Sequence, residues 1–273
     1  MTKVNKVLFI TQEIAPYVSD SEMALLGRNL PAAIQDKGRE IRTFMPKWGN
    51  INERRNQLHE VIRLSGMNLI VDDTDHPLII KVASIQSSRM QVYFIDNDDY
   101  FQNRMQACDE NGNEYEDNDE RAVFYARGVL ETVKKLRWQP DIIHCHGWIS
   151  ALAPLYIKRA YREEPSFRDS KVVYSLYDEE LHQSFDAGFV NRVLMKGLTK
   201  KDLANLPTPV DFVTLSKLAI DYSDGVVQQS EHVNEEVLAY ARQCGKPLLE
   251  YQADNFAEAC NDFYSLVGGE DEE

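Results

Sequence analysis

Short apolar runs alternate with amphipathic stretches along most of the chain. Residues 6–11 form the first apolar run, a helical pattern follows over residues 21–37, and a second apolar run covers 40–45 after Gly38. Apolar residues that recur every three or four positions indicate an amphipathic helix, and short apolar runs between such helices indicate buried strands. This order predicts an α/β fold with a mostly parallel sheet and helices on both faces.

The pattern changes in one part of the first half, where three strand-like runs follow one another without a helix between them: residues 58–71, 77–85 and 90–95. Consecutive strands without a crossover helix indicate antiparallel pairing. We therefore expect an antiparallel insertion over about residues 58–95, on the edge of the sheet. An acidic, Asn-rich loop follows, and Asn118 is expected to cap a helix that runs to about residue 136.

The β-α alternation resumes in the second half of the chain. Strands are expected at residues 141–146, 171–176, 225–228 and 247–251, and helices at 150–162, 212–222, 234–243 and 255–267. Residues 183–209 form an irregular excursion around a short helical stretch. We predict one Rossmann-like domain over residues 1–267 and a solvated acidic tail at 268–273.

Composition and charge narrow the range of partners. The chain has 273 residues, 43% of them hydrophobic and 27% charged, and its net charge of -14 argues against nucleic acid and anionic membranes as partners. A neutral sugar polymer remains compatible with this charge. No apolar run approaches the roughly 20 residues of a membrane span, and the polar start lacks the apolar core of a signal peptide. We therefore expect a cytoplasmic protein.

The cysteines and histidines do not suggest a metal site. Cys108, Cys145, Cys244 and Cys260 show no C-x-x-C spacing, so we expect them to be reduced and structural. His144 and His146 lack a third ligand at a suitable spacing. No metal and no cofactor are predicted.

The segment Asp141–Trp148 carries the most informative chemistry, because it places two histidines at the end of an apolar strand. Side chains alternate along a strand, so His144 and His146 should point to the same face. Ligands of doubly wound sheets bind beyond the carboxyl ends of the strands, where His146 and Trp148 would meet one. Alternatively, His144 is a hydrogen-bonded core histidine and Trp148 only packs against the next helix.

The loop after the first strand lacks the glycines that let a backbone approach phosphates. Glu13, Asp20 and Glu22 make this loop acidic, so it would repel a diphosphate. Ser19, Asp20 and Ser21 suit helix capping better than catalysis. Glu13 lies at the same sheet edge as His146, where a carboxylate and a histidine can orient a sugar hydroxyl, unless Glu13 is simply solvated.

Several strings occur together in a recognisable order: Gln12–Pro16, Asn29–Ala33, Phe44–Trp48, Tyr93–Asp96 and Asp141–Trp148. In this order they resemble the N-terminal domain of bacterial glycogen synthase and plant starch synthase, over about residues 6–229. The resemblance implies a glycosyltransferase architecture of two Rossmann-like domains. The first contributes contacts to the acceptor glucan, and the second holds most of the ADP-glucose.

Some of the family's motifs are changed in this chain. The family's Lys-x-Gly-Gly phosphate motif falls at Ser19, Asp20, Ser21 and Glu22, and its His-x-His-Asp-Trp-His motif has Gly147 and Ile149 at the aspartate and the last histidine. The Thr-x-His-Asn element falls at residues 175–178, with Tyr177 at the histidine. The resemblance implies a catalytic position for His146 and substrate contacts for a larger set: Glu13, His146, Trp148, Tyr177 and Asp178.

Three functions fit these observations. The chain could be inactive alone and bind an α-glucan or malto-oligosaccharide, or a protein partner such as a synthase-like chain or another copy of itself, through a cleft made polar by Glu179, Glu180 and Glu231. Alternatively, it is an active glucosyltransferase subunit whose donor-binding half comes from a second chain. A third alternative is another transferase chemistry near Tyr177 and His182. In the first case, ADP-glucose is not expected to bind this chain.

Overall fold

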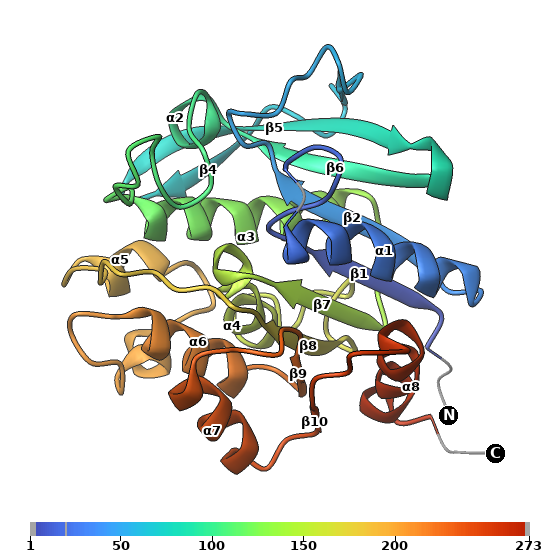
Figure 1. The fold of residues 1–273 in the computed structure, drawn as a ribbon. Coiled ribbons are helices and arrows are strands. Elements are labelled where there is room, and N and C mark those ends of the chain that lie inside the picture. Colours follow the sequence, from blue (N-terminus) through green and yellow to red (C-terminus); the bar gives the residue numbers. More distant parts are fainter. Residues whose placement is uncertain (1–3, 20, 271–273) are drawn as a thin grey trace.

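The computed structural model describes residues 4–19 and 21–270 and confirms the α/β fold predicted from the sequence (Figure 1). The strands are β1 (Lys6–Ile10), β2 (Glu40–Pro46), β3 (His59–Glu60), β4 (Met67–Val71), β5 (Thr74–Ile85), β6 (Met90–Asp96), β7 (Ile142–His146), β8 (Lys171–Leu176), β9 (Gly225–Gln228) and β10 (Leu248–Leu249). The α-helices are α1 (Glu22–Asp36), α2 (Asp98–Phe101), α3 (Asn118–Lys135), α4 (Ala153–Lys158), α5 (Phe189–Val193), α6 (Phe212–Asp221), α7 (Glu235–Gln243) and α8 (Phe256–Gly268). Short 3₁₀ helices cover Gln86–Ser88, Trp148–Ser150 and Lys200–Leu203.

The sheet reverses its strand order at its centre. Its strands lie in the order β10-β9-β8-β7-β1-β2-β6-β5-β3, and β4 pairs with β5 beside them. The chain therefore builds outward from β1 to β2 and β6, and later returns to place β7 on the other side of β1. Such a reversal creates a crevice at the carboxyl ends of the two central strands, which is where open α/β sheets bind ligands.

Two hydrophobic cores cover the two faces of the sheet. The larger core contains Ile143 and Cys145 of β7 together with apolar residues of α3, α4 and α6. The second core contains Phe9 and Ile142 together with residues of α1 and α8, which lie next to each other (Figure 1). Helices cover both faces of the parallel sheet, so the side chains on both faces of each strand are buried. This explains why the strands are continuous apolar runs in the sequence.

His144 belongs to the interior of the second face. It is completely buried, and its two ring nitrogens are hydrogen-bonded to the Tyr264 hydroxyl of α8 and to Ser175 Oγ of β8, each at 2.6 Å. Burial keeps its pKa well below the ordinary value, so the ring is neutral. The alternative of a hydrogen-bonded core histidine is therefore correct for His144.

The antiparallel region differs from the expectation in two ways. Residues 58–71 form two strands, β3 and β4, because the chain turns between them at Gly66, whose φ of 86° favours glycine. The run expected at residues 90–95 is β6, which pairs in parallel with β2 and antiparallel with β5. Strand β6 thus belongs to the main sheet as well as to the insertion.

Two helix starts also differ. The expected helix at residues 150–162 is shortened to α4, because Pro154 lacks an N–H and is tolerated only in the first turn. Asn118 is the first residue of α3, and Asp117 holds the N-cap position; the Asn118 side chain donates to the Ala107 carbonyl instead.

At the other end of the chain, Gly268 is still helical, and residues 271–273 of the expected tail lie outside the described residues.

Within residues 4–19 and 21–270, no helix is both long and apolar enough to cross a membrane. The same residues contain no group of three or more His, Cys, Asp or Glu side chains that could hold a metal ion.

The hydrogen bond between His144 and Tyr264 gives a stability prediction. Tyr264→Phe should lower the free energy of unfolding by about 1–3 kcal/mol, because it leaves a buried ring nitrogen without a partner. Chemical denaturation at pH 7 measures this loss. The control is Tyr251→Phe, at a half-buried tyrosine outside both cores, which should change stability by less than about 0.5 kcal/mol. Equal effects of the two variants would contradict an anchoring role for Tyr264.

Candidate functional site at the carboxyl edge of the sheet

The reversal of strand order brings together two predicted site residues, Glu13 and His146. Strands β1 and β7 pair in parallel up to Ile10 and Cys145, so both strands end at the same edge. His146 is the last residue of β7, and Gln12 and Glu13 follow closely after β1. The backbone register of two neighbouring strands therefore places these side chains at the crevice of the sheet.

His146 is enclosed and neutral. Its ring packs against that of His144 at a tilt of 40°, with ring centroids 3.9 Å apart, and only 1% of the residue is exposed. Its Nδ1 is hydrogen-bonded to the Tyr177 hydroxyl at 2.7 Å, while its Nε2 is buried without a partner among the described residues. Burial lowers the pKa of His146 to about 3 and raises that of Tyr177 well above its ordinary value.

Gln12 occupies the space above the end of β7. Gly147 has a φ of 82°, and a Cβ atom at that position would lie 2.5 Å from Gln12 Oε1. Both the φ of Gly147 and its closeness to Gln12 therefore favour glycine at this position. Gln12 Oε1 is buried without a partner among the described residues, and its Nε2 donates to Glu179 at 3.2 Å. No site role was predicted for Gln12, although its position just after the first strand was a signal.

Glu179 forms the second acidic group of the crevice. Loss of solvent around its carboxyl group raises its pKa to about 8, and the nearby negative charge of Glu13 acts in the same direction. Hydrogen bonds from Gln12 and from the backbone N–H of Trp148 oppose this shift without cancelling it. The carboxyl group is therefore mostly protonated at neutral pH and can donate a hydrogen bond.

The loop between β1 and α1 confirms one capping prediction. Ser21 is the N-cap residue of α1 and accepts a hydrogen bond from the Ala24 N–H at 2.9 Å. Its hydroxyl donates to Glu13 Oε2 at 2.5 Å. Glu13 is partly buried, and loss of solvent raises its pKa. Ser19 is exposed, and Asp20 lies outside the described residues.

Glu22 connects this loop to the far side of the crevice. Its carboxylate accepts a hydrogen bond from the Ser230 hydroxyl at 2.6 Å, and Ser230 Oγ in turn accepts from the Asp178 N–H at 3.0 Å. The loops that follow β1, β8 and β9 are thus joined by hydrogen bonds through Ser230.

The two other predicted substrate contacts lie in different surroundings. Trp148 is only 2% exposed and packs in the larger core, as the packing alternative expected. Asp178 is exposed at the rim of the crevice. The structure therefore brings together Glu13, His146 and Tyr177, leaves Asp178 at the surface, and places Trp148 beneath the crevice.

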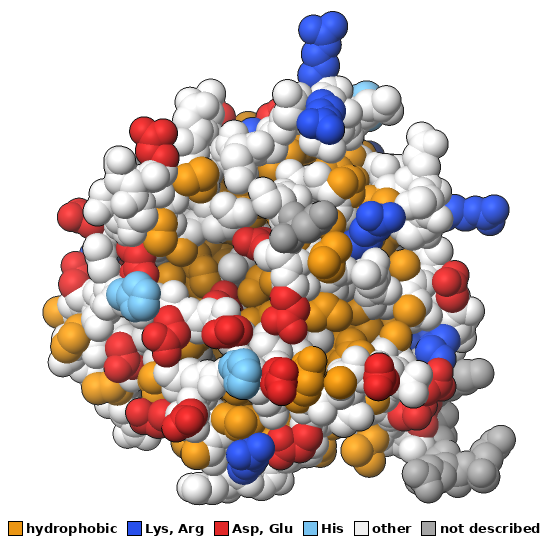
Figure 2. All heavy atoms as spheres, viewed as in Figure 1, with side chains coloured by type: hydrophobic (Ala, Val, Ile, Leu, Met, Phe, Trp, Pro, Cys, Tyr) orange, Lys and Arg blue, Asp and Glu red, His pale blue; other side chains and the backbone are white. Residues whose placement is uncertain are grey.

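The carboxyl edge of the sheet is acidic. The five segments that line this edge, residues 12–14, 21–23, 146–150, 177–180 and 229–232, contain no Lys or Arg. Figure 2 shows acidic side chains over the centre and left of the visible face, while most Lys and Arg side chains lie toward its upper and right margins. A small cavity of about 10 Å³ lies beside Tyr177 and Glu179, on the side of α6 and α7, and His146 does not line it. Hydrogen-bond acceptors outnumber cations here, which favours a ligand rich in hydroxyl groups over a phosphate.

Comparison with known proteins agrees with this picture of fold and motifs. The family model for the starch synthase catalytic domain matches residues 6–249. The glycogen synthase of Pelodictyon phaeoclathratiforme is 33% identical over 271 residues, which cover 97% of this chain and 53% of that protein. The glycogen synthase of Chlorobaculum tepidum is 34% identical over 270 residues, with the same coverage of 97% and 53%.

A solved structure shows the same fold. The catalytic domain of starch synthase IV from Arabidopsis thaliana, bound to ADP and acarbose, superposes with a TM-score of 0.72 at 17% identity and covers 91% of this chain and 51% of that one. The chain thus spans about half the length of the relatives it matches. Because the family model matches most of its length, the chain belongs to the family of the starch synthase catalytic domain.

Proposed function

We propose that this chain is an α-glucan-binding domain of starch synthase type that does not transfer glucose by itself. The observation that carries the proposal is the crevice at the carboxyl edge of the sheet. It combines His146 Nε2 and Gln12 Oε1, which have no partner among the described residues, with partly buried carboxyl groups of Glu13 and Glu179. The segments that line it contain no Lys or Arg.

Transfer from ADP-glucose requires stabilisation of the departing diphosphate. Enzymes provide this with cations or with hydrogen-bond donors that are already in place. Here the loop from β1 to α1 is closed by the bonds of Ser21 to Glu13 and of Glu22 to Ser230. A diphosphate at this loop would meet carboxylates in a partly desolvated setting, where repulsion between like charges is strongest.

A neutral sugar fits the same groups better. Carboxylates and amide oxygens accept hydrogen bonds from sugar hydroxyls, and a protonated Glu179 can donate one in return. A hydroxyl group at His146 Nε2 would also satisfy a buried atom that has no partner among the described residues. Because His146 Nε2 and Gln12 Oε1 are buried, Tyr177 or Gln12 must turn aside when a glucan end enters.

One observation favours a second candidate, an active subunit completed by another chain. The groups on the acceptor side are retained, whereas positive charge is missing from the loops that would face a donor. A second polypeptide with Lys or Arg residues at that face would supply what this chain lacks. The Arabidopsis relative, bound to ADP and acarbose, illustrates the pair of ligands that such an assembly would hold.

Titration with maltoheptaose tests the proposed binding. We expect saturable heat in calorimetry, and we expect His146→Ala to weaken binding about tenfold, because one hydrogen bond in a buried site contributes about 1.4 kcal/mol. Tyr177→Phe keeps the ring but removes the hydrogen bond to His146 Nδ1. A similar loss of maltoheptaose affinity in a variant that still folds would show that the effect is on binding and not on stability.

The matched control is His182→Ala, because His182 is exposed near the same sheet edge. This variant should bind maltoheptaose as the unchanged protein does. If the unchanged protein gives no saturable binding, or if His182→Ala is as damaging as His146→Ala, the glucan would not bind in this crevice.

Transfer activity distinguishes the two candidates. Purified protein with ADP-glucose and maltoheptaose should incorporate no glucose above a sample without protein, because nothing in the crevice stabilises a diphosphate. Radiolabelled incorporation measures this. Incorporation by this chain alone would refute the claim that it is inactive alone, and incorporation only after a donor-binding chain is added would favour the second candidate.

The raised pKa of Glu179 predicts a pH effect on stability. The pKa of Glu179 is about 8 in the folded protein, above its value in the unfolded chain. As the pH rises, the unfolded chain therefore loses this proton first. The folded protein loses stability from the unfolded pKa up to about pH 8. Glu179→Gln keeps the acceptor but cannot ionise. It should therefore be more stable than the unchanged protein by about 1–2 kcal/mol at pH 8, a value reduced for partial exposure.

This gain should vanish near pH 4.5, where the carboxyl group is protonated in both states. Denaturation of both proteins across pH 4.5–8 measures the difference. The control is Glu180→Gln, at the exposed neighbouring position, which should show no such pH dependence. A constant difference between Glu179→Gln and the unchanged protein would contradict the raised pKa.

A further inference from the structure

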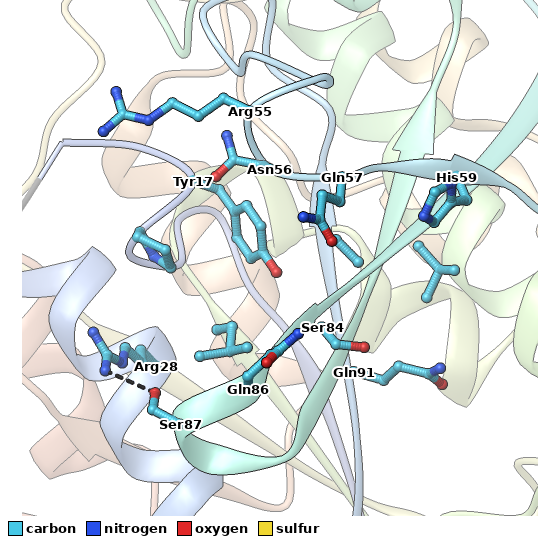
Figure 3. A pocket seen from close by; sticks show the side chains of 14 residues that line it. Tyr17, Arg28, Arg55, Asn56, Gln57, His59, Ser84, Gln86, Ser87 and Gln91 are labelled. Carbon is cyan, nitrogen blue, oxygen red and sulfur yellow. Dashed lines mark hydrogen bonds between the residues drawn. The ribbon is translucent and has the colours of Figure 1, made fainter.

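A second polar hollow lies on the other half of the molecule, away from His146. It has a volume of about 540 Å³ and is formed by the loop after β1, helix α1, residues 55–59, the end of β5, the following 3₁₀ helix and the start of β6. Figure 3 shows Tyr17 at its centre, with side chains from these separate segments around it. None of the residues assigned to the carboxyl-edge crevice lines this hollow.

The charge of the hollow is unusual for this chain. The protein carries 44 Asp and Glu residues against 30 Lys and Arg, yet the lining contains Arg28, Arg55 and His59 and no carboxylate. Arg28 is half-buried and donates to Ser87 Oγ at 3.2 Å. Within residues 4–19 and 21–270, neither arginine forms an ion pair with an Asp or Glu. Two guanidinium groups without carboxylate partners favour an anionic group of a ligand.

The remainder of the lining suits a ring that carries hydroxyl groups. Figure 3 places both arginines on one side of Tyr17, and Gln57, Ser84 and Gln91 on the other. Amides and hydroxyls both donate and accept hydrogen bonds, which matches the alternating needs of sugar hydroxyls. Val82 and Ile85 add apolar surface to the lining, where the C–H face of a sugar ring can pack.

Tyr17 supplies an independent observation. It is only 6% exposed, its ring packs edge-on against Phe94 at 4.9 Å, and its hydroxyl oxygen is buried without a hydrogen-bond partner among the described residues. Burial raises its pKa to about 12, so the hydroxyl keeps its proton. The exposed side chains of Gln57 and Gln86 lie on either side of this hydroxyl (Figure 3), and they can turn to admit a ligand.

We propose that this hollow, which we call the Tyr17 pocket, binds a hexose phosphate. The phosphate lies between Arg28 and Arg55, and the sugar ring lies over Val82 and Ile85. A ring hydroxyl satisfies the unpartnered hydroxyl of Tyr17. The proposal does not depend on glucan binding at the carboxyl edge, because the two sites share no residue.

Titration of the full chain with glucose 6-phosphate and glucose 1-phosphate tests the proposal, with glucose and inorganic phosphate as separate arms. At least one hexose phosphate should bind saturably, and about tenfold more tightly than either glucose or inorganic phosphate, because both halves of the pocket contribute. Binding of inorganic phosphate or glucose as tight as that of the hexose phosphates would overturn the proposal, as would no saturable binding of either hexose phosphate.

Variants locate the site. Arg28→Gln and Arg55→Gln should each weaken hexose phosphate binding about tenfold, because each removes a charged hydrogen bond to the phosphate. The matched control is Arg54→Gln, at an exposed arginine of the same loop that does not line the pocket. If Arg54→Gln weakens binding as strongly as the other two, the effect is one of overall charge and the pocket is not the site.

Tyr17→Phe separates binding from stability. Removing a buried hydroxyl without a partner should leave the melting temperature of the free protein unchanged or higher, while hexose phosphate binding weakens about tenfold. A loss of binding with a lower melting temperature, or unchanged binding, would show that the hydroxyl is not a ligand contact. Maltoheptaose binding should be the same in all four variants, so failure at this pocket is distinguishable from failure at the carboxyl edge.

Discussion

The parallel pairing of β1 with β7 at the centre of the sheet determines where everything else in the candidate site lies. The two strands end together, so the register that pairs Ile10 with Cys145 also brings Gln12 beside Gly147 and sets His146 at the crevice. A shift of one residue would turn both histidines toward the opposite face. His144, held by Tyr264 and Ser175, helps to exclude that shift, because any other register would leave its ring nitrogens buried without partners.

Several residues at the carboxyl edge act as a set. Gly147 leaves room for Gln12, Tyr177 is bonded to His146, and Ser21 caps α1 while holding Glu13. Tyr177, Ser21 and Glu22 each have a hydrogen-bond partner at this edge. His146 Nε2 and Gln12 Oε1 are buried without a partner among the described residues, which is costly unless a ligand supplies one.

Much of the fold followed from the sequence, because periodic apolar patterns and glycine or serine boundaries are local signals. The strand carrying the histidines, the capping by Ser21 and the closing helix were all predictable. The pairing of β6 with β2 was not, because a strand's neighbour depends on contacts across the chain. The role of Gln12 and the Tyr17 pocket likewise depend on the packing of segments that are far apart in sequence.

The central claim is that the carboxyl edge of this domain selects hydroxyl groups over phosphates. A calorimetric competition between maltoheptaose and ADP at low ionic strength tests it most directly, because low salt gives charge its largest effect. Arg28→Gln/Arg55→Gln protein should be used, so that the second pocket cannot contribute. The account predicts that maltoheptaose binds with an affinity that ADP does not change. Saturable ADP binding that competes with maltoheptaose and is lost in His146→Ala would contradict it.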